Sequence, residues 1–112
     1  MPQFKNARLG EDVKRELSDI FRGLKDPRID PMITIVNVDL APDQSYCKVY
    51  VSSLDGLDRA KETVKGLESA AGYIRRELGH RLQMRRSPQL KFIPDNSIQH
   101  SADIAQKLGE IL

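Results

Sequence analysis

The spacing of apolar residues changes repeatedly along this 112-residue chain, and this alternation constrains the fold more than any single motif does. Apolar side chains recur every three or four positions over residues 8–24, which predicts an amphipathic helix. Residues 32–40 and 46–53 alternate apolar and polar side chains, which predicts two strands that each turn one face to a core. Helical spacing returns over residues 57–84, so the chain should mix helices with a small sheet.

The two strands are joined by residues 41–45, whose Pro and Asp have the chemistry of a turn. We therefore expect an antiparallel hairpin. Tyr46 and Tyr50 fall on the outer face of the second strand, where aromatic rings can stack on bases; we expect a helix to cover them instead. The inner faces should carry Val36, Val38 and Leu40 from the first strand and Cys47, Val49 and Val51 from the second.

The end of the chain predicts one more strand and one more helix. Residues 89–94 follow Pro88 and read as a third strand, and residues 97–111 read as a helix with good N-cap residues at its start. The third strand must return to the sheet through a helical crossover on one face. The expected fold is a two-layer α+β domain spanning residues 1–112, with a small mixed three-stranded sheet and its helices on one face.

A run of small residues interrupts the long helical segment. Ser69-Ala70-Ala71-Gly72 stands in its middle, and Gly in a helix interior costs about 1 kcal/mol relative to Ala. A kink there would start a second helix near Gly72, whose free backbone N–H groups and dipole favour a phosphate. Close packing against another helix also needs small residues, so both explanations of the junction stand.

Basic residues gather directly after this junction. The chain has a net charge of +2, yet residues 72–91 hold six basic residues against Glu77 and so carry +5. A basic patch on an otherwise acidic molecule is typical of a protein that binds a polyanion, although a solvated helix face has the same composition. On a helical wheel Arg75, Arg76 and Arg86 lie away from the apolar stripe, and we expect them to contact phosphates.

The sequence offers little for catalysis. Cys47 is expected to be a buried, inert thiol, because it lies on the inner face of a strand. His80 and His100 have no partners at metal-ligand spacing, and no glycine-rich phosphate loop can be built. A lone cysteine excludes an internal disulfide, and no signal peptide or membrane-length apolar run is visible. We expect a cytoplasmic, non-enzymatic protein without a metal or cofactor.

Four stretches in this order resemble the ribosome-binding factor A family, a type II KH variant. A KH module joins two helices by a GxxG loop that clamps nucleotide backbone, and here a small-residue junction replaces that loop. The resemblance covers nearly the whole chain. The stretches are Leu24-Lys25-Asp26-Pro27-Arg28-Ile29; Asp39–Asp43 with Cys47–Ser52; Ala70-Ala71-Gly72-Tyr73-Ile74-Arg75; and Pro88–Phe92 with Asp95–Ile98.

The resemblance implies a role in ribosome assembly. Members bind the free small (30S) ribosomal subunit, promote late maturation and 5′-end processing of 16S rRNA near its 5′-terminal helix, and matter most in the cold. It further implies a KH-like monomer that acts without catalysis and is released with the help of an assembly GTPase. Some members carry a basic tail beyond the last helix, whereas this sequence stops at Leu112.

Two other functions remain open from the residues alone. One is a general KH module for single-stranded RNA, and the other is a protein–protein adaptor that uses the free sheet face or the last helix. Lys25 and Arg28 lie in a segment that is either an RNA contact or a simple helix stop, and Arg81 and Arg85 lie nearer the apolar side of the wheel. The residues expected to bind RNA are Arg75, Arg76, Arg86, Gly72, Lys25, Arg28, Arg81 and Arg85, and those expected to form the kink are Ala70, Ala71 and Gly72.

Overall fold

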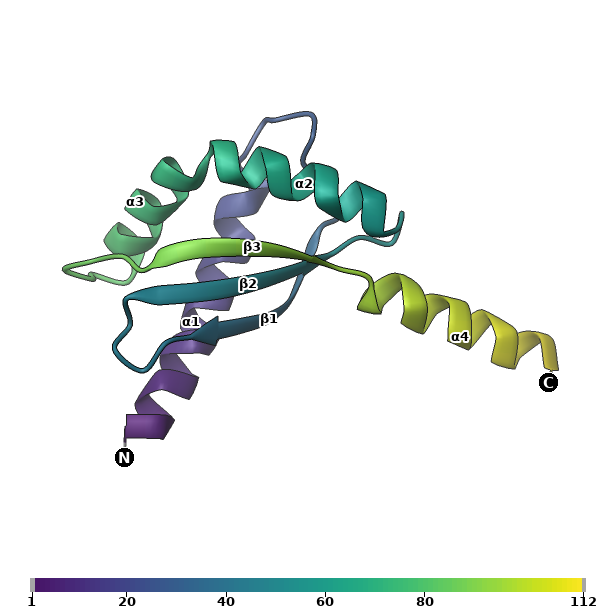
Figure 1. Cartoon of the computed structure of the whole chain (residues 1–112), viewed down its shortest axis with the longest axis horizontal. Helices are drawn as coiled ribbons and strands as arrows, with labels where there is room; N and C mark the ends of the chain where they lie inside the picture. The colour runs from purple at the N-terminus through teal and green to yellow at the C-terminus, as the bar shows by residue number, and fades with distance from the viewer. Residues whose placement is uncertain (1, 112) are drawn as a thin grey trace.

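The computed structural model describes residues 2–111, with side chains described for residues 8–98 and 104–109. Within these residues, helices and strands follow the predicted order (Figure 1). No helix in the same range is both long and apolar enough to cross a membrane. The elements are α1 (Pro2–Arg22), β1 (Thr34–Leu40), β2 (Tyr46–Ser52), α2 (Leu57–Ser69), α3 (Ala71–Arg81), β3 (Gln89–Asp95) and α4 (Ser97–Ile111).

The sheet has the order β1-β2-β3 and is mixed, as the sequence predicted. β1 and β2 form the expected antiparallel hairpin, closed by a hydrogen bond from the Ala41 N–H to the Tyr46 carbonyl oxygen at 2.8 Å. β3 pairs with β2 in parallel, with Tyr46 opposite Gln89 and Lys48 opposite Lys91. A parallel pair requires a crossover, and α2 and α3 supply it.

The inner face of β1 differs from the prediction. The register shifts between Ile35 and Asn37, which leaves Val36 as the extra residue of a bulge. Ile35 is therefore opposite Val51 and is buried, whereas Val36 leaves the inner face on which we expected it. Val38 and Leu40 keep their predicted places, because the pairing beyond the bulge is regular.

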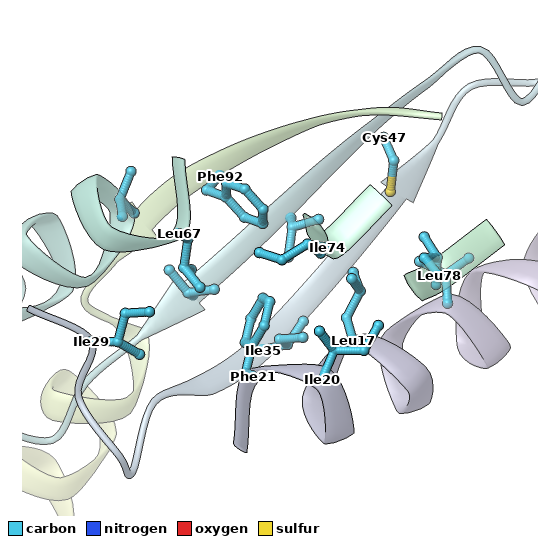
Figure 2. Close-up of a cluster of buried hydrophobic side chains, with 14 residues drawn as sticks. Leu17, Ile20, Phe21, Ile29, Ile35, Cys47, Leu67, Ile74, Leu78 and Phe92 are labelled. Carbon is cyan, nitrogen blue, oxygen red and sulfur yellow. The ribbon is translucent and has the colours of Figure 1, made fainter. Parts of the chain in front are cut away.

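Three helices pack on one face of the sheet, which is the two-layer arrangement expected (Figure 1). Figure 2 shows side chains from both layers meeting between them, including an edge-on contact of Phe21 with Phe92 at 6.1 Å between ring centroids. The buried apolar cluster is Val13, Leu17, Ile20, Phe21, Ile29, Ile35, Cys47, Val49, Val51, Val64, Leu67, Ile74, Leu78 and Phe92.

None of the helices that the structure describes covers the other face of the sheet, where we expected one. Tyr46, Lys48 and Tyr50 alternate along β2 with fully buried residues, and each of the three keeps part of its surface exposed. Figure 1 shows α4 leaving the end of β3 and extending away from the sheet, so it does not close this face. The expectation that a helix covers the two tyrosines was wrong.

α4 has the predicted bounds. The Asp95 carboxylate accepts a hydrogen bond from the Ser97 N–H at 2.6 Å, as an N-cap group does, and the Ser52 hydroxyl accepts one from the Ile98 N–H at 3.2 Å. Farther along α4, the apolar side chains of Ile104 and Leu108 are exposed and pack on no part of the core cluster.

Candidate nucleic-acid interface

The junction between α2 and α3 lies at Ala70, which ends one helix and begins the next. Its N–H still donates to the carbonyl oxygens of Gly66 and Leu67, and its own carbonyl accepts from Ile74 at 2.9 Å. The predicted kink is therefore present, but α3 starts one residue before Gly72. We expected the backbone N–H groups at the start of this second helix to be free, but the Ala70 N–H is already bonded to the last turn of α2.

Gly72 does not serve close packing. A Cβ built on this exposed residue would meet nothing within 4 Å, whereas a Cβ on Gly66 would lie 2.7 Å from Cγ1 of Ile29. The glycine that packing requires is thus Gly66, which the sequence analysis did not single out. Of the two reasons considered for Gly72, close packing is thus excluded, and the open space at this residue leaves room for another molecule to approach.

α3 ends at Arg81, although the sequence predicted helix to residue 84. The Met84 N–H donates to the Gly79 carbonyl oxygen at 2.9 Å and the Gln83 N–H to that of His80 at 3.3 Å, which is the Schellman pattern. Gln83 adopts the left-handed conformation with φ of 52°, a place where glycine is usual. Residues 85 and 86 consequently lie in a loop, and the helical wheel did not place them correctly.

Arg75 holds this loop against α3. Its guanidinium donates from Nε to the Pro88 carbonyl oxygen at 3.1 Å and from Nη2 to the Ser87 carbonyl oxygen at 3.1 Å. The loop packs close to α3 at Gly79, where a Cβ would lie in ordinary van der Waals contact with the Ser87 Cβ, at 3.6 Å. Arg75 therefore anchors the loop, which is a structural role, and its positive charge lies at the base of the loop.

The loop brings Arg85 and Arg86 to the end of the molecule where Arg76 lies on α3. Arg76 and Arg85 line a shallow hollow of about 430 Å³, and Arg86 lines a second hollow of about 400 Å³. Arg75 and Ser87 border both hollows. Arg76, Arg85 and Arg86 are exposed, and none of them forms an ion pair with any described residue. We call the surface of these three residues the basic end.

Arg81 and Arg28 are in a different state, because each is paired with an acid. Arg81 binds the carboxylates of Asp19 and Glu16 on α1, and its hydrogen bond lowers the pKa of Asp19. Arg28 binds Asp26 at 2.6 Å and the Ser69 hydroxyl at 2.9 Å, which ties the segment after α1 to the end of α2. Both arginines cross-link elements of the fold.

Lys25 lies apart from the basic end. It lines a hollow of about 360 Å³ between the end of α1 and the segment that follows it, together with Phe21 and Pro27. Gly72 and Arg76 lie one helical turn apart on α3, so they share a surface. The structure thus brings Gly72, Arg76, Arg85 and Arg86 to the α3 side and separates Lys25 from them.

Sequence analysis missed Tyr46 and Gln89 as neighbours of the arginines. Both line the hollow that holds Arg86, because β2 and β3 run in parallel and begin at the same edge, where the Gln89 N–H donates to the Ser45 carbonyl oxygen at 3.0 Å. The predicted crossover between these strands was the one signal that pointed to this edge. No local pattern in the sequence links residues 46 and 86.

Cys47 is fully buried, as expected from its place on the inner face. Burial, with a smaller effect of the Asp39 charge, raises the pKa of its thiol to about 11. A thiol with this pKa stays protonated near neutral pH and is a poor nucleophile. Among the described side chains, no three His, Cys, Asp or Glu residues gather as metal ligands would.

The chain is similar to proteins of one family. The family model of Ribosome-binding factor A matches residues 5–108. Ribosome-binding factor A of Agathobacter rectalis is 44% identical over 108 residues, which cover 96% of this chain and 89% of that protein.

Two solved structures show the same likeness in three dimensions. The crystal structure of ribosome-binding factor A from Thermus thermophilus has a TM-score of 0.70 and 32% identity, and the match covers 79% of this chain and 92% of that one. A homology model of the Thermus thermophilus factor, fitted into the cryo-EM map of a 30S–RbfA complex, has a TM-score of 0.64 and 32% identity over 77% of this chain and 90% of that one.

Proposed function

Because the chain belongs to the ribosome-binding factor A family, we propose that it binds the small ribosomal subunit through the basic end. One relative of similar fold has been fitted into the map of a 30S complex, which supports the choice of partner. The observation that carries the choice of surface is the contrast among the arginines. Arg28 and Arg81 are held by acids, whereas Arg76, Arg85 and Arg86 are exposed and unpaired within the described part of the chain.

Unpaired arginines suit rRNA for a physical reason. An arginine that contacts a phosphate releases counterions from the RNA, and that release favours binding at low salt. A planar guanidinium also bonds a phosphate through two donors, which fixes its orientation. Gly72 lies one turn before Arg76 on α3 and has no side chain, so a nucleic-acid backbone can come close to the helix there.

The finer role follows from how a binding protein acts on RNA. A factor with no reaction of its own shifts an equilibrium only by binding one rRNA conformer more tightly than another. Escape from a misfolded conformer slows in the cold when its barrier is high. We therefore propose that the protein promotes late maturation and 5′-end processing of 16S rRNA, that it matters most in the cold, and that it acts as a cytoplasmic monomer released by an assembly GTPase.

The test is a salt titration of binding to purified small subunits. The variant Arg76→Glu/Arg85→Glu/Arg86→Glu should flatten the slope of log K against log salt by up to about 0.9 for each phosphate that the three side chains no longer neutralise. A matched control, Arg22→Glu/Lys61→Glu/Lys65→Glu, reverses as many charges on exposed residues of α1 and α2 and should keep the wild-type slope. Equal slopes for the two triple variants would remove the basic end from the contact and favour a protein–protein adaptor.

A further inference from the structure

We propose that the uncovered face of β2 and β3 is a second binding surface, one that takes single-stranded RNA continuing from the basic end. The surface consists of Tyr46, Lys48 and Tyr50 on β2 and Lys91 on β3, and we call it the tyrosine face. The inference rests on the proposed function, since it extends the RNA path that begins at the arginines.

Strand geometry places these side chains together. Cys47, Val49 and Val51 point into the core and are fully buried, so the residues that alternate with them share the outer face. Along β2 the Cα atoms of Tyr46 and Tyr50 lie about 13 Å apart by the rise of a strand, with Lys48 midway between them. Each ring can therefore hold its own base, and the lysine lies where the linking phosphates would pass.

The tyrosines are available to a ligand. Neither phenol hydroxyl hydrogen-bonds to another residue within the described part of the chain, and the helices α1, α2 and α3 pack on the opposite face. The rings lie on the central strand of the sheet, which is paired with β1 on one side and β3 on the other. Aromatic rings presented in this way serve as platforms on which the bases of a single strand stack.

Two lysines, Lys48 and Lys91, are a second feature of this face that favours the binding of an anion. Lys48 and Lys91 are direct cross-strand neighbours in the register of β2 and β3, and neither forms an ion pair with a described residue. Like charges placed opposite one another on a sheet are unfavourable, and a phosphate between them would relieve the repulsion. Asp39 lies opposite Lys48 on the β1 side, so the RNA should follow β2 and β3 and avoid β1.

The tyrosine face is continuous with the basic end. Tyr46 lines the same hollow of about 400 Å³ as Arg75, Arg86 and Gln89, at the edge where β2 and β3 begin. A strand of RNA that leaves Arg86 would meet Tyr46 first and then Lys48 and Tyr50. Bases in a duplex hide their faces from a protein, so this arrangement of rings fits a single strand.

Tyrosine fluorescence tests the inference directly. The chain has three tyrosines and no tryptophan, so a Tyr73→Phe variant emits only from Tyr46 and Tyr50. A single-stranded oligouridylate should quench this emission as it binds, while a duplex RNA of equal length should leave it unchanged. Failure of the single strand to quench at saturating concentration would overturn the proposal.

Substitutions on the tyrosine face provide a second test of the inference. Tyr50→Ala should weaken binding of the oligouridylate about tenfold or more, which is the usual effect of removing one stacking ring, and Tyr50→Phe should keep wild-type affinity. Lys48→Gln/Lys91→Gln should lower the salt dependence for the single strand alone. Unchanged affinity in Tyr50→Ala would contradict the inference, as would a loss of small-subunit binding without any loss of RNA binding, which would point to a protein partner.

The outcomes separate this inference from the proposed function. If charge reversal at the basic end abolishes binding to small subunits while Tyr50→Ala changes nothing, the proposed function stands and the tyrosine face is excluded. If Tyr50→Ala weakens the oligouridylate and charge reversal leaves subunit binding intact, the basic end is excluded and the tyrosine face stands as an RNA site.

Discussion

The Nη2 atom of Arg75 lies 3.1 Å from the carbonyl oxygen of Ser87, and this bond ties α3 to the loop that carries Arg85 and Arg86. The arginine that the sequence placed first among the RNA contacts is thus the one that shapes the surface for the others. Its second bond, to the carbonyl oxygen of Pro88, fixes the point where the loop enters β3.

Replacement of Arg75 should therefore lower stability. Arg75→Ala removes two charge-assisted hydrogen bonds from a partly buried site, and we expect a loss of about 1–2 kcal/mol in the free energy of unfolding. Arg76→Ala, on the next and exposed residue, should change it by less than about 0.5 kcal/mol. Urea denaturation of both variants measures the difference, and equal midpoints would show that Arg75 does not anchor the loop.

The glycines on either side of the helix junction should respond in opposite directions. Gly66→Ala forces a Cβ to within 2.7 Å of the Ile29 Cγ1, and such overpacking costs about 1–3 kcal/mol, more than the helix propensity of Ala returns. Combining it with Ile29→Ala should cost less than the sum of the single changes, because the clash is gone. Thermal unfolding of the four proteins in the cycle checks this, and strict additivity would contradict the clash.

Gly72 separates binding from stability. A Cβ there meets nothing, so Gly72→Ala and Gly72→Val should leave the melting temperature unchanged within a few degrees or raise it. We expect Gly72→Val to weaken binding to small subunits, since its side chain fills the space where a backbone would approach, and Gly72→Ala to weaken it less. Full binding by the valine variant would show that no RNA backbone comes close at this junction.

Acid should destabilise the protein partly through Asp26. The hydrogen bond from Arg28 lowers the pKa of this carboxyl from 3.8 to about 2 in the folded protein. A depressed pKa stabilises the fold above the unfolded value, and this contribution is lost as pH falls from about 4 to about 2. As the pH falls through that window, the melting temperature should fall less steeply for Asp26→Asn than for the wild type. Parallel plots of melting temperature against pH would show that protonation of Asp26 does not destabilise the fold.

The biological role has its own test. Cells that lack the protein should grow slowly at low temperature and accumulate free small subunits with unprocessed 5′ ends of 16S rRNA. Cys47→Ser should restore growth, because the thiol is buried and protonated, and His100→Ala should do so as well, although the side chain at position 100 lies outside the described residues. Arg76→Glu/Arg85→Glu/Arg86→Glu should not restore it. Normal rRNA ends in the deletion strain in the cold would defeat the assembly role.

Local patterns were enough to predict the order of the elements. The alternation over residues 46–53 and the cap residues before residue 97 are signals within a few positions, and the hairpin and the bounds of α4 matched them. The bulge at Val36 was not predictable in this way, because a register depends on which residues of the partner strand are buried. Likewise, nothing in the sequence marks Gln83 as the left-handed residue that ends α3, since glycine usually fills that place.

The candidate site depended even more on distant contacts. Arg81 and Arg76 are both arginines of one helix, and only the packing of α1 beside α3 decides that Arg81 meets Asp19 while Arg76 stays unpaired. Arg28 differs, because its acid partner Asp26 is only two residues away and only its second partner, Ser69, lies far along the chain. Composition and periodicity predicted a basic surface, and tertiary structure decided which of its charges remain free.

The parallel pairing of β2 with β3 also bears on how the chain reaches its native state. The hairpin of β1 and β2 closes a short loop, but β3 joins β2 only after residues 53–88 have formed the crossover. Closing a long loop costs conformational entropy before the contacts between β2 and β3 can stabilise the chain. The parallel pair should therefore form late and limit the folding rate. During synthesis, Phe92 cannot enter the core until β3 has left the ribosome that makes the chain. For the same reason, the edge that joins Tyr46 to Arg86 cannot form before then.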